Sequence, residues 1–339
     1  MNNFTYQRAA TVADATAAVY ADARAQFVAG GTNIIDLWKY NLTHPARLVD
    51  LNSIPTHRGL DATDYGGVLI GAFMTNAETA YHPLIEQRYP LLSRAILAGA
   101  SAQIRNMATN GGNLLQRTRC YYFYDPCAPC NKRVPGSGCA AIKGRNRMHA
   151  ILGASAECIA VFPSDMCVAL AALDATVHVS GPSGPRSIAF QDFHRLPGKT
   201  PEQDNTLQRG EVITSLELPA EGFSQHYSYL KVRDRNSYAF ALVSVATGLT
   251  LDNGTIKEAR IALGGVAHKP WRVTEAEAFL HGKPANEQAF AGAADILLRG
   301  AKGYKYNAFK ITLAKRAIIR NGMMALNPDS QRPGAQPSA

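Results

Sequence analysis

The sequence predicts a protein of two domains, the first of α/β character and the second α+β, on the strength of its length and of two successive hydrophobic patterns. The chain has 339 residues, of which 46% are hydrophobic and 18% charged, and a chain of this length and composition commonly forms roughly two globular domains. Up to about residue 220, short strand-like and helix-like segments alternate. Beyond that point strand-like segments come first and helix-like segments follow, which is typical of a separate α+β domain.

The elements of the first part follow from the spacing of apolar residues and from the turn residues between them. Residues 11–25 are rich in alanine at helical spacing, and residues 89–99 have an amphipathic helical pattern. Ser164 and Asp165 supply an N-cap for a helix that ends near Leu173. Strands are predicted at residues 4–6, 26–29, 47–51, 68–71, 158–161 and 175–179, and a helix or turn at residues 34–39.

In the second part, the turn Asp252-Asn253-Gly254 lies between apolar runs and predicts a β-hairpin. Strands are expected at residues 226–232, 239–251 and 261–266, and helices at residues 273–281 and 309–324. Residues 327–339 are rich in Pro, Ser, Gln and Gly, so we expect a flexible tail there.

The chain carries 35 basic and 26 acidic residues, a net charge of +9, which suits nucleic acid, an acidic partner or a polyanionic cofactor. The densest basic run, residues 117–147, contains one acid, Asp125, and we interpret this run as part of a cofactor site. The first residues are polar, without the apolar core of a signal peptide, and no apolar stretch is long enough to span a bilayer. We therefore expect a soluble chain with no membrane span.

Two glycine-rich segments are candidate phosphate-binding loops. In the first, a predicted strand runs into Gly30-Gly31-Thr32-Asn33, where glycine lets a phosphate approach the main-chain N–H groups. In the second, Arg105 precedes Thr109-Asn110-Gly111-Gly112-Asn113. Each segment could also be an ordinary turn, the second an Asn-Gly hairpin. Dinucleotide-fold and P-loop glycine motifs are absent, which disfavours a Rossmann fold.

All six cysteines lie between residues 120 and 167. Clustering of this kind in a large chain indicates a metal site more than a disulfide framework. Zinc and iron–sulfur clusters both accept four thiolates. Only Cys127 and Cys130 form a close pair, and the other spacings are irregular, which favours a cluster. We expect the aromatic run at residues 121–124 to shield it and the basic residues to offset its negative charge.

Taken together, four ordered motifs resemble the FAD-binding subunit or domain of the xanthine dehydrogenase (molybdenum hydroxylase) family. The motifs are residues 27–33, residues 104–113, Pro163-Ser164-Asp165-Met166 and Lys231-Val232-Arg233, and the resemblance runs from about residue 4 to residue 320. It implies an FAD-binding fold of the vanillyl-alcohol-oxidase type in two subdomains, followed by an α+β domain of the CO dehydrogenase flavoprotein type. The implied bounds are residues 1–222, with subdomains of about 1–56 and 57–222, and residues 223–326.

The resemblance also assigns roles to individual residues. The pyrophosphate would be held by the first loop, that is by Gln26, Phe27, Val28, Ala29, Gly30, Gly31, Thr32, Asn33 and Ile34. Thr109, Gly112 and Asn113 would hold the flavin side. Asp165 would bind the adenosine half or a nearby polar edge, and Lys231 would lie near the isoalloxazine, where a cation can stabilise negative charge on the reduced ring.

Within the family, the cysteine-rich insertion at residues 117–158 is similar to that of the middle subunit of periplasmic aldehyde oxidoreductases, which binds a [4Fe–4S] cluster. The resemblance implies Cys120, Cys130, Cys139 and Cys158 as its ligands. Cys127 is the rival to Cys158, because it completes a set of four thiols within twenty residues. Cys167 is expected to be structural.

The resemblance implies an electron-transfer subunit of a molybdenum-dependent aldehyde oxidoreductase, a heterotrimer. Electrons would pass from the molybdenum cofactor and [2Fe–2S] clusters of partner subunits to FAD, and then to an external acceptor. The complex would be periplasmic through co-export with a signal-bearing partner, and the chain otherwise cytoplasmic. The alternatives are the flavin subunit of an aromatic acyl-CoA reductase or xanthine dehydrogenase, and a basic iron–sulfur protein that binds nucleic acid, for which no recognition helix is evident.

Overall fold

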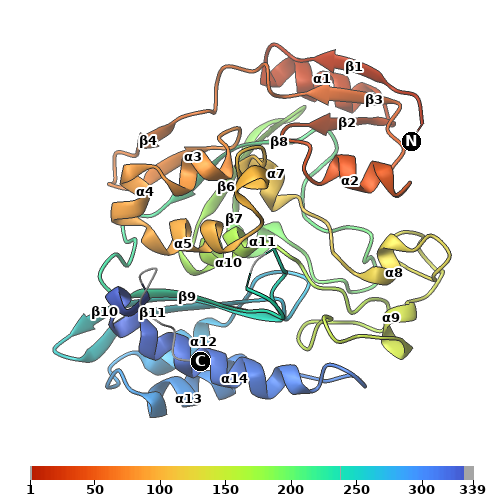
Figure 1. Ribbon diagram of the computed structural model, residues 1–339. Helices are drawn as coiled ribbons and strands as arrows, with labels where there is room; N and C mark the ends of the chain where they lie inside the picture. The colour runs from red at the N-terminus through yellow and green to blue at the C-terminus, as the bar shows by residue number, and fades with distance from the viewer. Residues whose placement is uncertain (1, 237, 332–339) are drawn as a thin grey trace.

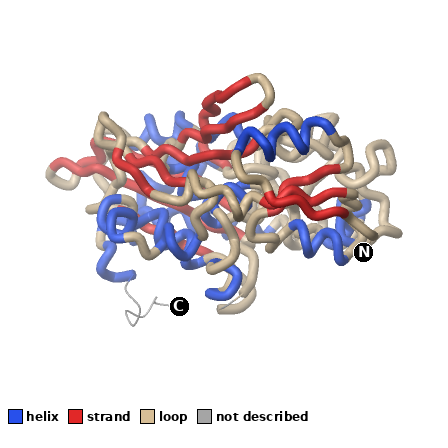
Figure 2. The backbone as a smooth tube through the Cα atoms, turned by 90° about the horizontal axis from the view of Figure 1, so that it is seen from above, coloured by secondary structure: helices blue, strands red, loops and turns tan. Residues whose placement is uncertain are grey.

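The structure, a computed structural model, describes residues 2–236 and 238–331. Its N-terminal unit is a three-stranded parallel sheet with strand order β1-β3-β2, which lies at the top of Figure 1 and is seen from above in Figure 2. Thr11 starts the first helix with a capping box to Asp14. The elements are β1 (Thr5–Arg8), α1 (Val12–Ala21), β2 (Ala25–Val28), α2 (Ile34–Lys39) and β3 (Arg47–Asp50).

The second unit is a five-stranded antiparallel sheet with strand order β4-β5-β8-β6-β7. Its strands are β4 (Leu60–Ala62), β5 (Val68–Gly71), β6 (Thr176–Gly181), β7 (Gly184–Ala189) and β8 (Val212–Leu218). Its helices are α3 (Asn76–Ala80), α4 (Pro83–Arg88), α5 (Pro90–Ala98), α6 (Ala102–Arg105), α7 (Asn110–Leu114), α10 (Asp165–Ala172) and α11 (Phe190–Phe193). One hydrophobic core joins this unit to the first, because Val49, Ile70, Leu170 and Leu216 are all buried in it.

The third unit, coloured blue-green to blue in Figure 1, is an antiparallel sheet with helices packed against it. It contains β9 (Tyr227–Val232), β10 (Val243–Asp252), β11 (Thr255–Gly264), β12 (Trp271–Arg272), α12 (Thr274–Leu280), α13 (Glu287–Leu297) and α14 (Phe309–Leu326). The predicted hairpin is confirmed, with Asp252 paired to Thr255. Asn253 and Gly254 both have positive φ, as its tight turn requires. The sequence pattern did not predict α13 or β8.

Between the second and third units runs the cysteine-rich segment, which bulges from one side of the molecule (Figure 1). Its only helices are α8 (Tyr121–Tyr124) and α9 (Ala140–Lys143). Ile151 and Leu152 are buried in the core of the third unit, so the segment is held to the C-terminal part of the chain. The strand predicted at residues 158–161 is wrong: Ile159 and Ala160 are buried but form no strand. A short apolar run indicates burial without deciding between strand and loop.

Among the described residues no helix is both long and apolar enough to cross a bilayer. Of the predicted tail, residues 328–331 form the short 3-10 helix η1 (Pro328–Gln331). Asn327, the first residue of that predicted tail, is the C-cap of α14, and residues 332–339 lie outside the described residues.

Candidate functional site

The two glycine-rich loops touch each other backbone to backbone. The first loop connects β2 to α2, and its Gly31 has a φ of 72°, a conformation that favours glycine. A Cβ atom on Gly30 would lie 1.8 Å from the carbonyl oxygen of Met107, so only glycine allows this approach. Met107 belongs to the second glycine-rich segment. Two loops that the sequence places about eighty residues apart are therefore adjacent in space.

The second loop opens a short helix and not a hairpin turn. Thr109 is the N-cap of α7, and its hydroxyl oxygen accepts a hydrogen bond from the Gly112 N–H at 3.2 Å. The Asn113 amide donates to Asn76 Oδ1 at 2.6 Å and accepts from Ser164 Oγ at 2.5 Å. Thr109 and Asn113 thus fix the loop and join α7 to the start of α10.

Two neighbouring hollows lie along these loops, and we call them together the cofactor cavity. Their volumes are about 220 and 250 Å³, and both are lined by Thr32, Asn33 and Gly112. Other predicted residues in the lining are Phe27, Ala29, Gly30, Gly31, Ile34, Thr109, Asn113, Asp165 and Lys231. Gln26 and Val28 are not in it, because alternate residues of β2 face opposite sides. The Gln26 amide instead bonds to Thr43 Oγ1.

Three buried nitrogen atoms in the lining have no hydrogen-bond partner among the described residues. They are Asn33 Nδ2, Arg105 Nε and Arg119 Nε. The oxygen of the Asn33 amide accepts from the Arg117 N–H at 3.1 Å, which leaves its NH₂ group for the cavity. An unpaired buried donor costs about 1–3 kcal/mol. The cavity therefore fits a ligand rich in acceptor oxygens, such as the pyrophosphate of FAD.

Asp165 and Lys231, predicted to contact opposite halves of FAD, form an ion pair of 2.8 Å. Asp165 also accepts from the Tyr229 hydroxyl at 2.7 Å, and Lys231 donates to Ala98 O at 3.0 Å. Burial and the Asp165 charge raise the Tyr229 pKa well above its usual value. Since the two side chains touch, both lie at one end of the cavity. Their assignment to separate halves of the cofactor stays a prediction.

Four of the six cysteines line one small hollow, which we call the thiol cavity. They are Cys120, Cys130, Cys139 and Cys158, together with Phe123 and Lys132. Cys127 is exposed and does not belong to this lining, whereas Cys167 is fully buried in α10. The structure thus gathers the four thiols that the resemblance implied and leaves the rival thiol outside.

The four thiols differ in environment. Burial raises the pKa of Cys120 to about 12. A hydrogen bond with Cys158 lowers the pKa of Cys139 to about 6 and raises that of Cys158. Cys130 and Cys139 face each other in an isolated antiparallel bridge. Within the described part of the chain, no three His, Cys, Asp or Glu residues are placed to hold a single metal ion.

Four of the seven basic residues at positions 117–147 are paired with acids far away in the chain. Lys132, which is buried, and Arg117 both contact Asp204. Burial opposes ionisation of Asp204, but these two cations outweigh it and lower its pKa. Arg119 pairs with Asp36 at 2.7 Å. Arg147 pairs with Asp234 at 2.7 Å. The expectation that the basic run offsets the charge of a cluster stays a prediction.

Of the predicted aromatic shield, Phe123 is buried and Tyr122 also lines the thiol cavity. Tyr121 is 62% exposed and does not shield the site.

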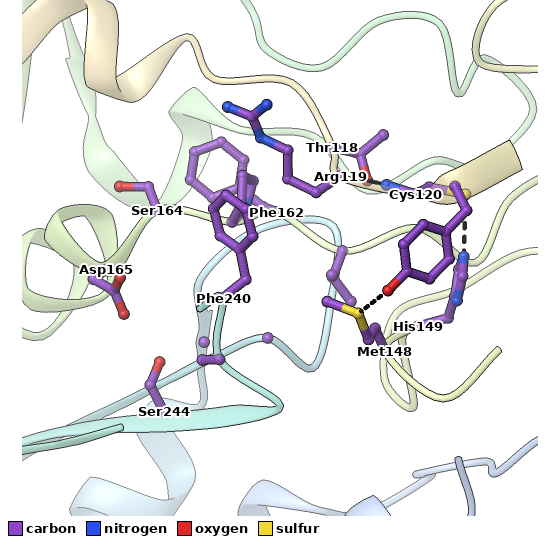
Figure 3. Close-up of a pocket in the computed structure, with 16 residues that line it drawn as sticks. Thr118, Arg119, Cys120, Met148, His149, Phe162, Ser164, Asp165, Phe240 and Ser244 are labelled. Atoms are coloured by element: carbon purple, nitrogen blue, oxygen red, sulfur yellow. Dashed lines mark hydrogen bonds between the residues drawn. The ribbon is translucent and has the colours of Figure 1, made fainter. Parts of the chain in front are cut away.

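A narrow space of about 20 Å³, shown in Figure 3, is lined by residues of both cavities. It shares Cys120 with the thiol cavity, and Arg119, Ser164, Asp165 and Phe240 with the cofactor cavity. The guanidinium of Arg119 lies 5.3 Å from the Phe240 ring centre. Arg119 immediately precedes Cys120 in the chain, and it also lines the cofactor cavity. Sequence reasoning missed the roles of Arg105, Arg119 and Phe240, and only the position of Arg105 beside the second glycine loop could have indicated one of them.

Comparisons with known proteins agree with this architecture. Residues 2–221 match the family described as the FAD binding domain in molybdopterin dehydrogenase, and residues 227–316 match the CO dehydrogenase flavoprotein C-terminal domain. The chain is 48% identical, over 94% of its length and 96% of the relative, to the aldehyde oxidoreductase FAD-binding subunit PaoB of Escherichia coli. It is 26% identical to the glyceraldehyde dehydrogenase medium chain of Sulfolobus acidocaldarius, over 92% and 96% of the two chains.

A solved structure has the same fold. The carbon monoxide dehydrogenase structure from Hydrogenophaga pseudoflava contains a chain that superposes with a TM-score of 0.75, at 24% identity, over 96% of this chain and 97% of that one. The chain belongs to the family of FAD-binding subunits of molybdenum hydroxylases. It is thus an oxidoreductase subunit, and its two-part FAD-binding and C-terminal architecture confirms the predicted fold class.

Proposed function

We propose that this chain is the electron-transferring flavin subunit of a molybdenum-dependent aldehyde oxidoreductase. In this proposal, FAD receives electrons from a partner's molybdenum and [2Fe–2S] centres and delivers them to an external acceptor. The observation that carries the proposal is the cofactor cavity, where two glycine loops meet beside three unpaired nitrogen donors. The aldehyde as substrate rests on the name of the 48%-identical relative. The family match favours this function over binding of nucleic acid.

The residues of the chain bind and orient the flavin cofactor, whose own chemistry is the exchange of electrons. Asn33, Arg105 and Arg119 would donate to acceptor oxygens of the cofactor. The glycines let the main chain approach it closely. At the Asp165–Lys231 end the ammonium is already neutralised by a carboxylate, so this end would accept a polar edge of the cofactor without a net charge.

We further propose a [4Fe–4S] cluster bound by Cys120, Cys130, Cys139 and Cys158. Four thiolates are the usual ligand set of such a cluster, and these four cysteines share one cavity while Cys127 is exposed. The structure thereby favours Cys158 over Cys127 as the fourth ligand. The Lys132–Asp204 pair beside the cavity would hold the surrounding loops in place.

The partners in this proposal are a molybdenum-cofactor subunit and a [2Fe–2S] subunit. Support comes from the relatives, which are named as an FAD-binding subunit and as medium chains. We propose a periplasmic location reached by co-export with a signal-bearing partner.

The function is tested by co-expressing the chain with the neighbouring genes, purifying it by a tag, and measuring flavin, iron and molybdenum. The expected result is about one FAD and four irons per chain, with molybdenum on a copurified subunit. Addition of an aldehyde without an acceptor should bleach the flavin absorbance. A colourless chain that purifies alone, or a yellow complex that no aldehyde bleaches, contradicts the proposal. Fractionation of cells into periplasm and cytoplasm tests the location.

The ligand set is tested by single Cys→Ser variants of the holoenzyme. Cys158→Ser should lose the cluster, whereas the matched control Cys127→Ser should keep about four irons per chain. Flavin content separates loss of the cluster from general unfolding, because the cofactor cavity is a distinct hollow. The reverse pattern of iron loss would establish Cys127 as the ligand.

A further inference from the structure

A buried histidine faces one of the four thiols of the thiol cavity. Nε2 of His149 lies 3.1 Å from Sγ of Cys120, the contact drawn as a dashed line in Figure 3. This separation is within the range for a hydrogen bond to sulfur. The His149 side chain is almost fully buried, and its ring lies 6.2 Å, centre to centre, from the ring of Tyr122. No step of the proposed function uses this histidine.

The main chain at His149 is held by residues from the C-terminal unit. The carbonyl oxygen of His149 accepts a hydrogen bond from Asn307 Nδ2 at 3.1 Å and another from Lys310 Nζ at 2.9 Å. Lys310 is fully buried, and its ammonium also donates to Gly265 O at 2.6 Å. Two side chains near the start of α14 therefore fix the backbone that aims the imidazole at Cys120.

The contacts of the ring also indicate which nitrogen carries the proton. Nδ1 of His149 is buried and has no partner among the described residues. A proton on Nδ1 would be a buried donor without an acceptor, and the bare Nε2 would then face the electron-rich sulfur of a thiolate. A proton on Nε2 instead makes an N–H···S hydrogen bond and avoids the unpaired donor. The Nε2–H tautomer is thus the one that suits a thiolate at Cys120.

We propose that His149 is a positioning residue that donates a hydrogen bond to the Cys120 thiolate and thereby raises the reduction potential of the cluster. Hydrogen bonds to the sulfur atoms are among the factors that set the potential of iron–sulfur clusters. A reduced cluster carries more negative charge than an oxidised one, so a donor stabilises the reduced form more. Because Cys120 also borders a space that residues of the cofactor cavity line, this potential would govern electron sharing with the flavin. The inference rests on the proposed cluster ligands.

The test compares three variants of the holoenzyme by EPR-monitored redox titration. His149→Phe removes the donor and retains a ring, His149→Gln retains an N–H donor, and His268→Phe is the matched control. His268 is also buried, but neither of its ring nitrogens makes a hydrogen bond to a cysteine sulfur within the described structure. In His149→Phe, we expect the oxidised-to-reduced equilibrium to shift on the order of tenfold towards the oxidised form, about 59 mV for one electron. His149→Gln should keep a potential close to that of the wild type, and His268→Phe should leave the potential unchanged.

Iron content decides which proposal a failure contradicts. A wild-type chain without iron contradicts the cluster and leaves no potential to compare. Full iron occupancy in His149→Phe with an unchanged potential overturns the role of His149. An equal shift in the Phe and Gln variants also overturns it, because packing and not the hydrogen bond would then be responsible. If His149→Phe fails to assemble a cluster, the Gln variant still tests the inference. The inference requires His149→Gln to show a near-normal potential and EPR spectrum, and a changed potential in that variant overturns it.

Discussion

The cofactor cavity and the thiol cavity are neighbours, but their polar groups are arranged in opposite ways. In the cofactor cavity, Asn33, Arg105 and Arg119 present nitrogen donors that have no partner within the described structure. Beside the thiol cavity, by contrast, the buried ammonium of Lys132 is bonded to Asp204 and to Pro201 O. The first site leaves its hydrogen bonds open for a ligand, whereas the second has its charged groups already satisfied by protein.

The two sites also differ in how the chain builds them. The cofactor cavity lies at the ends of regular elements, where α2, α7 and α10 begin. The thiol cavity lies in a segment with only two four-residue helices, which is held in place by ion pairs and by Arg133 bonded to the carbonyls of Tyr122 and Phe123. Loss of the bound ligand should therefore destabilise mainly the cofactor cavity. Loss of a single ion pair should destabilise mainly the thiol cavity.

The largest effect is expected from Asp204→Asn, which leaves Arg117 and the buried Lys132 without their carboxylate. Removing one partner of a buried ion pair costs about 3–5 kcal/mol, so the free energy of unfolding should fall by this order. Denaturant titration measures the change. The matched control is Asp234→Asn at the exposed Arg147 pair, where we expect less than about 1 kcal/mol. Equal effects of the two variants would mean that the pair beside the thiol cavity is not structural.

A second effect concerns pH, through a histidine that supports the cofactor cavity. His194 Nε2 contacts Leu114 O at the end of α7 at 2.9 Å, and burial lowers the His194 pKa to about 4. An unfolded chain binds a proton here near pH 6.5, whereas the folded chain does so only near pH 4. Stability from this group is therefore fully present above pH 6.5 and declines as the pH falls towards 4, by about 3 kcal/mol. Denaturant titrations over this range should show a flatter decline in His194→Gln, and an unchanged slope would contradict the assignment.

Gly30→Ala tests the contact between the two glycine loops. The added Cβ would clash with Met107 O at 1.8 Å, and overpacking of this kind costs about 1–3 kcal/mol. Because the loops can then no longer touch, the ratio of flavin to protein absorbance should also drop. Gly59→Ala is the matched control, since no described atom lies within 4 Å of a Cβ at that position. A Gly30→Ala chain with full flavin content would show that cofactor binding does not depend on the contact between the loops.

The smallest effect is expected from Arg105→Lys, which keeps the positive charge but removes the unpaired Nε donor. We expect the Kd for FAD to rise about tenfold, equivalent to about 1.4 kcal/mol, with little change in the free energy of unfolding. Fluorescence titration of the flavin-free chain measures the Kd. Arg58→Lys, which loses bonds to Ile54 O and Asn52 O away from the cavity, should leave the Kd unchanged. An unaltered Kd in Arg105→Lys would show that its Nε does not contact the cofactor.

What could be predicted from the sequence depended on whether a feature is contiguous in the chain. The glycine loops and the thiols at residues 120, 130 and 139 are local motifs, and each lies in the cavity expected for it. The Asp165–Lys231 pair joins residues 66 positions apart, and Asp204 meets Lys132 across 72 positions. No spacing rule reveals such contacts, because they depend on how the units pack. The apolar run at residues 158–161 indicated burial, but it could not identify a loop because that too depends on how the units pack.

The bonds from Asn307 and Lys310 to the carbonyl of His149 also impose an order on biosynthesis. A ribosome makes residues 120–158 well before it makes α14. Until α14 has emerged and packed, the carbonyls of Met148 and His149 lack these donors and Ile151 and Leu152 lack much of their core. The contacts that complete the packing of the cysteine-rich segment therefore form only after the C-terminal unit has been synthesised.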